Sequence, residues 1–472
     1  MKKVLLSFFI FLAGMIMSSA QCLPISGTFI NLPYQDVRNL YTNPPYFDNT
    51  DPQMWATKVD EMHEMGMEYL IFMSVANEEK AYYPSKLMDW HYPKWRQSPV
   101  DAIMDAAAKH GMKVFMSTGW AKDQDDNLRD PAIKARQMEM MEELAGLYGS
   151  HPAFYGWYLP VEDCFGPVLT DYAVEAANAL TARARELTPE AKIMISPYGI
   201  FISDFDDPRY EQQISRLTVD IIAYQDEVGC VREKYPLTRL RENWKKLRAI
   251  HDKNGIEMWA NCETFAWDRA TNDRTSALIP APFPRLLSQM VAATDGGAER
   301  IISFIICGLF EKPGSQYQLG QPYWSVKAYE DYMAWLGGDQ YWHRAQQYMG
   351  SACPAQAKED PSDKGWIVCE EGPHEFEVEL DKDCNYFDVR MLNCQKDGIV
   401  PPAKLFLFVS KDGREWSLHQ IKDTPVWANT NHDAFVDYVS FENLPSDAKY
   451  LKLSFTAENK AYVFYSQVAE IR

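Results

Sequence analysis

Two glutamates, Glu162 and Glu263, each follow an apolar run with aromatic neighbours, and such a pair could cleave a glycosidic bond. Glu162 ends the stretch Phe154–Glu162 (FYGWYLPVE), and Glu263 lies within Trp259–Phe265 (WANCETF). When two carboxyl groups lie about 5 Å apart, one can attack a sugar carbon while the other protonates the leaving oxygen. Repulsion between the two carboxylates, together with apolar surroundings, helps one carboxyl group to stay ionised and the other to stay protonated. We predict Glu162 as the general acid/base and Glu263 as the nucleophile. The non-catalytic alternative for each is a solvated loop glutamate or an N-cap partner of the next helix.

The elements that would position these glutamates repeat along the first two thirds of the chain. Eight short apolar runs alternate with amphipathic segments, and most runs are apolar throughout, as in parallel strands covered on both faces. This repeat favours a (β/α)8 TIM barrel over an open doubly wound sheet. The runs are Pro24–Ile30, Tyr69–Ser74, Lys113–Thr118, Phe154–Leu159, Lys192–Ser196, Val219–Tyr224, Glu257–Asn261 and Arg300–Ile306.

The segments between the runs carry helix start and stop signals. Asp51-Pro52, Ser98-Pro99 and Asp130-Pro131 each place a capping side chain before a proline, whose fixed φ suits the first helical turn. Glycines such as Gly66 and Gly111 then precede the next run, where a helix would end. These signals predict a helix between consecutive strands.

In such a barrel, chemistry takes place at the carboxyl ends of the strands. Glu162 would follow the fourth strand and Glu263 the seventh, so the two side chains could face each other across the mouth. Asp226, after the sixth strand, is an alternative base for an inverting reaction, which needs carboxyl groups roughly 6.5–9.5 Å apart.

Aromatic and polar residues at the strand ends would line the same mouth. Aromatic rings stack on the apolar faces of pyranoses, and polar side chains bind their hydroxyl groups. Each strand-end residue, taken singly, could instead have a structural role. Trp157 would have one if it filled the barrel interior, and Glu311 is a further polar residue at a strand end. The predicted substrate-binding residues are Asn31, Ser74, Asn77, Trp120, Tyr158, Tyr198, Gln225, Asp226, Phe265 and Trp267.

The pattern changes after the barrel region. We predict a barrel domain over 21–345, a polar linker over 346–363, and a β-sandwich over 364–472. Asp412-Gly413 is a hairpin turn signal between two predicted strands. The alternating runs are Phe376–Leu380, Tyr386–Leu392, Lys404–Ser410, Phe435–Phe441, Tyr450–Phe455 and Ala461–Ile471.

Composition narrows the function classes. The 472 residues include 66 Asp and Glu against 47 Lys and Arg, and the net charge of −19 argues against binding to a nucleic-acid backbone. The chain contains no CxxC pair, HExxH, GxGxxG, P-loop or GxSxG motif. We therefore predict no organic cofactor and no metal ligand, and no motif indicates a structural calcium ion in the sandwich.

The first twenty residues resemble a secretory signal. Lys2 and Lys3 precede the apolar run Val4–Met17, which small residues follow up to Ala20. About 14 apolar residues are too few to span a membrane, so we predict cleavage after Ala20 and a periplasmic or cell-surface location in a Gram-negative-type bacterium. Lipid attachment at Cys22 is a less favoured alternative. The nine cysteines, an odd number, all lie beyond this signal.

Four stretches resemble a secreted bacterial TIM-barrel family catalogued as a domain of unknown function. They are Tyr82–Ser85 (YYPS), Pro99–Phe115, Phe154–Glu162 and Trp259–Phe265. That family is similar in turn to the clan A retaining glycoside hydrolases, whose acid/base follows strand four and whose nucleophile follows strand seven. The resemblance covers about residues 24–340 and implies these roles for Glu162 and Glu263. Val161 departs from the clan, which usually has asparagine before the acid/base to hold the sugar 2-hydroxyl.

A second resemblance lies in the C-terminal region. Phe408–Trp416 (FVSKDGREW) is similar to the Ser-x-Asp-Gly-x-x-Trp hairpin of discoidin-like carbohydrate-binding modules. The resemblance implies a module that tethers the protein to glycan, while a purely structural lid on the barrel is the alternative.

These observations lead to one prediction and one alternative from another class. We predict a secreted retaining glycosidase acting on an oligo- or polysaccharide; sugar, linkage and oligomeric state stay open. The alternative is a non-catalytic glycan-binding protein on a barrel scaffold. The two differ in turnover, which Glu162→Gln and Glu263→Gln would remove from an enzyme.

Overall fold

The fold was analysed in a computed structural model of the chain. It describes residues 22–32, 48–120, 127–229, 237–267, 278–281, 283–320, 324–337, 346–348, 367–380, 384–393, 400–424, 435–441 and 443–470. The predicted signal segment 1–20 lies outside these ranges.

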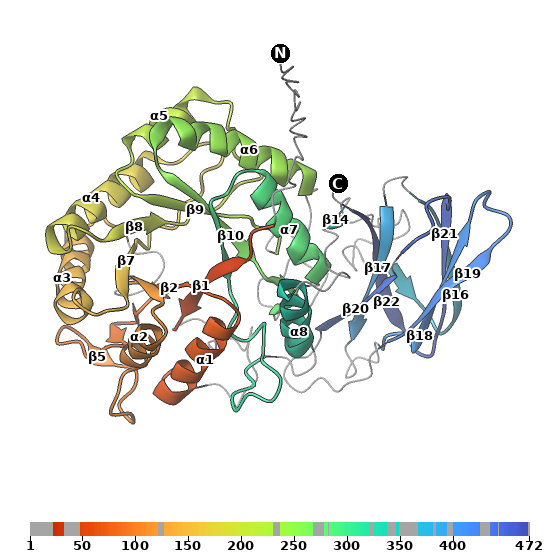
Figure 1. Cartoon of the computed structure of the whole chain (residues 1–472), viewed down its shortest axis with the longest axis horizontal. Helices are drawn as coiled ribbons and strands as arrows, with labels where there is room; N and C mark the ends of the chain where they lie inside the picture. The colour runs from red at the N-terminus through yellow and green to blue at the C-terminus, as the bar shows by residue number, and fades with distance from the viewer. Residues whose placement is uncertain are drawn as a thin grey trace, which may run out of the picture.

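Eight parallel strands form a closed barrel in the order β1-β13-β10-β9-β8-β7-β6-β2 (Figure 1). Each strand overlaps one of the eight apolar runs, so the predicted (β/α)8 fold is confirmed. The strands are β1 Ile25–Asn31, β2 Tyr69–Ser74, β6 Lys113–Met116, β7 Phe154–Tyr158, β8 Lys192–Ile195, β9 Ile221–Gln225, β10 Glu257–Glu263 and β13 Arg300–Phe304.

Side chains fill the inside of the barrel. Near the amino ends of the strands, Trp259 packs edge-on against Tyr69 at 5.1 Å between ring centroids and against Phe115 at 6.1 Å. Nearer the carboxyl ends, Tyr158 of β7 packs edge-on against Phe29 of β1 at 5.0 Å. Because the barrel is a packed core, chemistry is confined to its carboxyl end.

The eight helices of the described part surround the barrel (Figure 1). Three of them begin as the Asx/Ser-Pro signals predict, since Asp51, Ser98 and Asp130 each accept a hydrogen bond from a first-turn backbone N–H at 2.8–3.0 Å. The helices are α1 Pro52–Glu64, α2 Pro99–Lys109, α3 Pro131–Tyr148, α4 Asp171–Leu187, α5 Pro208–Arg216, α6 Leu237–Asn254, α7 Phe283–Asp295 and α8 Trp324–Leu336.

Two strand-to-helix connections carry small sheets of their own. Between β2 and α2, the strands β3 (Ala76–Asn77), β4 (Lys80–Ala81) and β5 (Asp89–Trp90) form a three-stranded sheet in that order. After β10, the strand β11 (Phe265–Trp267) pairs antiparallel with β12 (Leu278–Pro280). Both extensions stand at the carboxyl end of the barrel strands.

The C-terminal region forms two antiparallel sheets, as predicted for a β-sandwich (Figure 1). One sheet has the order β14-β22-β17-β20 with β15 also paired to β22, and the other has the order β16-β21-β18-β19. Apolar side chains of both sheets, such as Val389 and Leu453, form one buried core. The strands are β14 Gln346–Tyr348, β15 Ile367–Cys369, β16 Gly372–Glu379, β17 Cys384–Asn393, β18 Lys404–Ser410, β19 Ser417–Asp423, β20 Phe435–Phe441, β21 Tyr450–Ala457 and β22 Ala461–Glu470.

Two details of the sandwich bear on the sequence predictions. The turn between β18 and β19 contains Asp412-Gly413, as predicted, and Gly413 has a φ of +70°. Strand β14 falls inside the segment 346–363 that was predicted as linker, and it pairs with β22. The first sheet therefore includes residues from the start of that segment.

Candidate active site at the carboxyl end of the barrel

Glu162 lies just beyond β7 and is held by a side chain from β9. The Gln225 amide donates a hydrogen bond to Glu162 Oε1 at 2.8 Å and a second to the Ser196 carbonyl at 3.0 Å. Glu162 is half-buried. Gln225, predicted as a substrate-binding residue, thus holds the carboxylate of a predicted catalytic glutamate.

Two tyrosines surround the same carboxylate. Tyr158 is buried below Glu162, and burial together with the Glu162 charge raises the Tyr158 pKa well above its usual value. Tyr198, on the loop after β8, keeps 38% of its surface exposed. Burial raises its pKa first, and the neighbouring Cys164, Glu162, Asp163 and Glu227 add to that effect. Of the two, Tyr198 is the ring with substantial exposure beside Glu162.

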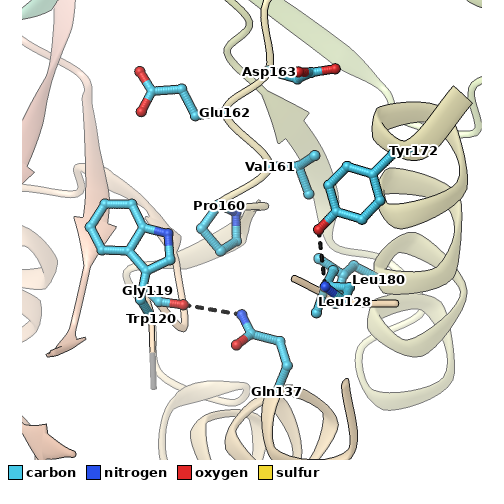
Figure 2. Close-up of a pocket in the computed structure, with 10 residues that line it drawn as sticks. All are labelled: Gly119, Trp120, Leu128, Gln137, Pro160, Val161, Glu162, Asp163, Tyr172 and Leu180. Carbon is cyan, nitrogen blue, oxygen red and sulfur yellow. Dashed lines mark hydrogen bonds between the residues drawn. The ribbon is translucent and has the colours of Figure 1, made fainter. Parts of the chain in front are cut away.

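A pocket opens beside Glu162 between the loops that follow β6 and β7. It has an empty volume of about 580 Å³, including the part open to solvent. Figure 2 shows the Glu162 carboxylate on the same side as the Trp120 ring, with Asp163 turned the other way. Trp120 thus lies where the sequence predicts, next to the candidate acid/base. The pocket is lined by Gly119, Trp120, Leu128, Gln137, Pro160, Val161, Glu162, Asp163, Tyr172 and Leu180.

The pocket walls are fixed by hydrogen bonds to α3 and α4. Gln137 of α3 donates to the Gly119 carbonyl at 3.1 Å, and the Tyr172 hydroxyl of α4 accepts from the Leu128 backbone N–H at 3.0 Å (Figure 2). Sequence reasoning missed both side chains, because residues in helix interiors give no sign that they face a pocket.

Glu263 is the last residue of β10, and it is almost completely buried at 3% exposure. Its backbone N–H donates to Asp226 Oδ1 at 3.1 Å, and its carbonyl accepts from the Gln289 amide at 3.1 Å. A Cβ placed on Gly229 would stand 2.9 Å from Glu263 Oε2. The Glu263 carboxylate therefore lies against the backbone of Gly229, where a Cβ would also stand 2.6 Å from the Phe265 carbonyl oxygen.

Asp226 is fully buried and bound by the protein itself. Its carboxylate accepts from the Gln289 amide at 2.6 Å, from the Glu263 N–H at 3.1 Å and from the Val228 N–H at 3.3 Å. Such a carboxylate holds the backbone around β9 and β10 and has no accessible surface for a substrate or an attacking water. Gln289, on α7, carried no sequence signal for this contact.

Glu227 is a further carboxylate near Glu162, and the sequence prediction passed over it although it directly follows Asp226. Its Oε2 accepts from the Gly199 N–H at 2.7 Å, and its φ of +54° lies in the left-handed region that side chains other than glycine rarely adopt. Burial raises the Glu227 pKa most, and the charges of Asp226 and Glu162 raise it further. It ties the loop after β9 to the loop after β8.

Asn31 and Ser74 end β1 and β2 and lie opposite each other in register. Both are fully buried. Ser74 donates to the Ala76 carbonyl at 2.8 Å, whereas neither amide atom of Asn31 has a hydrogen-bond partner among the described residues. Asn77 is half-buried on β3, and its carbonyl lies 3.0 Å from His91 Nε2. These three residues lie at the strand ends as predicted, below and beside the mouth.

The structure describes the side chain of one of the two predicted aromatic residues after β10, Phe265. Phe265 is buried and packs edge-on against Phe304 at 6.4 Å. Trp267 belongs to β11, but its side chain lies outside the described atoms. Trp157 points away from the mouth and donates to Thr188 at 2.8 Å. Glu311 is buried in an ion pair with Lys58 at 2.5 Å, which gives it a structural role.

The chain is thus a (β/α)8-barrel protein with acidic and aromatic side chains gathered at the carboxyl end of its strands. A family model matches residues 25–317, and the chain belongs to that family, which is described as a domain of unknown function (DUF4434). No curated protein matches the chain. Within the described ranges, no group of three or more His, Cys, Asp or Glu residues could hold a metal ion, and no helix is long and apolar enough to cross a membrane.

Solved structures of similar fold include glycoside hydrolases. A protein from Bacteroides thetaiotaomicron, described as a candidate α-L-fucosidase, is 18% identical with a TM-score of 0.54, over 71% of this chain and 99% of that chain. A β-galactosidase from Marinomonas ef1 is 14% identical with a TM-score of 0.41, over 67% of this chain and 61% of that chain. The similarity to the Bacteroides thetaiotaomicron protein shows that the two chains share the barrel fold.

Proposed function

We propose that this protein is a secreted glycoside hydrolase that acts by a retaining double displacement. In this proposal Glu162 is the general acid/base and Glu263 the nucleophile. The observation that carries it is the hydrogen bond from Gln225 to Glu162, which holds a half-exposed carboxylate at the end of β7, beside an open pocket with an aromatic wall. Glu263 stands at the end of β10 in the same ring of strand ends.

The surroundings of Glu162 suit an acid/base. The residue must reach the leaving oxygen in the first step and a water in the second, and its half-exposed side chain opens onto the pocket. Trp120 is buried and forms an apolar part of the pocket wall, whereas Tyr198 is the exposed ring near Glu162 on which a pyranose face can stack. Gln225 fixes the orientation of the carboxylate, so a substrate would meet a preorganised group.

We assign Glu263 as the nucleophile because it ends β10 and its backbone is fixed. Its N–H and carbonyl are bound to Asp226 and Gln289, so that the start of its side chain cannot drift. A nucleophile must lie within bonding distance of the sugar carbon, and a misplacement of about 1 Å is costly. We expect a separation of about 5 Å between the two carboxyl groups in the enzyme–substrate complex.

Gln225 also offers an answer to the missing asparagine before the acid/base. Val161 occupies that position in the sequence, but the Gln225 amide reaches the same carboxylate from β9. We assign to this amide the polar contact near the sugar ring that the clan obtains from its asparagine. Asp226, which was considered as an inverting base, is assigned to positioning because it is buried and bound to Gln289.

The C-terminal sandwich is proposed as a carbohydrate-binding module. Its β18–β19 hairpin has the Ser-x-Asp-Gly-x-x-Trp pattern, with Ser410 and Asp412 accepting backbone N–H groups inside the turn. These bonds make the turn rigid. The signal-like segment 1–20 supports secretion to the periplasm or cell surface, where such a module would meet glycans.

The test is hydrolysis of aryl glycosides by the full mature chain, with fucosides, galactosides, xylosides and glucosides of both anomers. We expect turnover of at least one, and a loss of about 10³-fold or more in Glu162→Gln and Glu263→Gln. Glu175→Gln, on the outer surface of α4, is the matched control and should keep full activity. Full activity in both site variants would refute the assignment, and absence of turnover with retained glycan binding would favour the non-catalytic alternative.

A further inference from the structure

We propose that Trp90 forms a separate, outer glycan-binding position, on which one pyranose ring of an oligo- or polysaccharide stacks. The choice of ligand class rests on the proposed function, whereas the shape of the position rests on the residues around Trp90. The position would extend the pocket at Glu162 sideways along the small sheet between β2 and α2.

The indole ring of Trp90 has one covered face and one open face. Tyr92 stacks on it with ring planes 1° apart and centroids 5.3 Å apart, and Tyr92 is itself buried. Trp90 keeps 46% of its accessible surface, so much of the residue stays open to solvent although Tyr92 stacks on its ring. An open aromatic face backed by a second ring is the surface on which the apolar face of a sugar stacks.

Hydrogen bonds hold this ring in place. The Trp90 indole N–H donates to the Ser85 carbonyl at 2.9 Å, and the Ser85 hydroxyl donates to Glu143 of α3 at 2.7 Å. Strand β5 pairs with β4 through Trp90 and Ala81. Because the side chain is already ordered, binding would lose little conformational entropy.

The position is connected to the pocket at Glu162 through the small sheet. Ala76, Ala81 and Trp90 are register partners across β3, β4 and β5, and the Ala76 carbonyl accepts from the Trp120 N–H at 3.3 Å. Neighbouring strands lie about 4.8 Å apart, so the backbones of Ala76 and Trp90 are about 10 Å apart. One sugar ring does not bridge this distance, so the ligand must be a chain of several sugars.

The surroundings favour a sugar over a protein partner. Charged, exposed residues lie near Trp90 on the same small sheet and in the loop before it: Lys80 and Asp89 form the register pair next to Ala81 and Trp90, and Lys86 precedes β5. Protein-binding patches extend over several hundred Å² of contiguous apolar surface. Hydroxyl groups at the rim of a pyranose could bind the charged groups near Trp90.

The test is affinity electrophoresis of the full chain through gels that contain soluble xylan, pectic galactan, arabinan or mucin. The variants are Trp90→Ala, Trp90→Phe, which keeps an aromatic face, and Leu147→Ala, an exposed residue of α3 outside the sandwich, as control. For any glycan that retards the parent protein, we expect about three- to tenfold weaker binding in Trp90→Ala. Trp90→Phe should stay within about twofold, and Leu147→Ala should match the parent.

Hydrolysis of a short aryl glycoside separates this proposal from the proposed function. Trp90→Ala should hydrolyse such a substrate at the parent rate, because the small substrate does not reach Trp90. Equal binding by parent and Trp90→Ala, or no retardation of the parent by any of the four glycans, would overturn the proposed glycan-binding position at Trp90. Turnover that persists in Glu162→Gln would instead refute the catalytic role of Glu162, independently of the electrophoresis result.

Discussion

Replacing Asp226 tests whether this carboxylate positions Glu263 or takes part in the chemistry. Its side chain accepts from the Gln289 amide, the Glu263 N–H and the Val228 N–H, all in the buried region behind β10. Asp226→Ala leaves these donors buried without the acceptor. A hydrogen bond to a charged group contributes about 1.5–3 kcal/mol, and a buried donor left without an acceptor costs about 1–3 kcal/mol.

Asp226→Asn is the sharper variant because it preserves shape. One amide oxygen can still accept from the Glu263 and Val228 N–H groups, while the new NH₂ group faces the Gln289 amide donor. Gln289 can turn over and present its Oε1, which has no partner among the described residues, but it then releases the Glu263 carbonyl. We expect a loss of stability of about 1–2 kcal/mol and a partial loss of kcat, about tenfold.

The assay combines thermal unfolding with aryl glycoside hydrolysis across pH. We expect Asp226→Ala to lower the Tm by about 5–10 °C and Asp226→Asn by less. In Asp226→Asn the pH profile should keep its shape, because a positioning residue adds no ionisation to the reaction. An unchanged Tm together with activity as low as that of Glu162→Gln would refute the positioning role and restore Asp226 as a base of an inverting reaction.

Two further predictions concern the barrel itself. Burial lowers the pKa of His251 from 6.5 to about 4, so the unfolded chain binds a proton that the fold excludes between these values. The free energy of unfolding is then highest above pH 6.5 and falls by about 3 kcal/mol toward pH 4. In His251→Gln, urea unfolding should show a free energy that depends less on pH than in the parent. The same pH dependence in variant and parent would contradict this prediction. Lys58→Met leaves the buried Glu311 carboxylate without its cation and should cost about 3–5 kcal/mol. Lys58→Met with Glu311→Met should recover part of that loss, because Glu61 still lacks its Lys58 partner at 2.8 Å. Equal melting of the single and double variants would contradict the ion-pair argument.

The barrel could be predicted because its signals are local. Runs such as Tyr69–Ser74 are apolar throughout since both faces of a parallel strand are covered, and prolines such as Pro99 mark the first turns of helices. In the sandwich, β19 (Ser417–Asp423) escaped prediction because its side chains are mostly exposed or half-buried and polar. Strand β14 has only three residues, too few for a periodic pattern.

Only those residues of the candidate site that directly follow a barrel strand could be predicted from the sequence. The ends of β7 and β10 located Glu162 and Glu263, and the end of β9 located Gln225. Gln289 approaches Asp226 only because α7 packs on β10 and β13, and no spacing in the sequence encodes that approach. The left-handed backbone of Glu227 is equally non-local, since loop contacts such as that with Gly199 hold it.

The central claim is that Glu263 forms a covalent bond to the sugar. The most direct measurement uses an activated 2-deoxy-2-fluoro glycoside of the sugar that the aryl glycoside panel identifies, followed by peptide mass spectrometry of the inactivated protein. We predict one glycosyl adduct, located on Glu263, and none in Glu263→Gln. An adduct on another residue, or turnover with inverted anomeric configuration and no adduct, would contradict the claim.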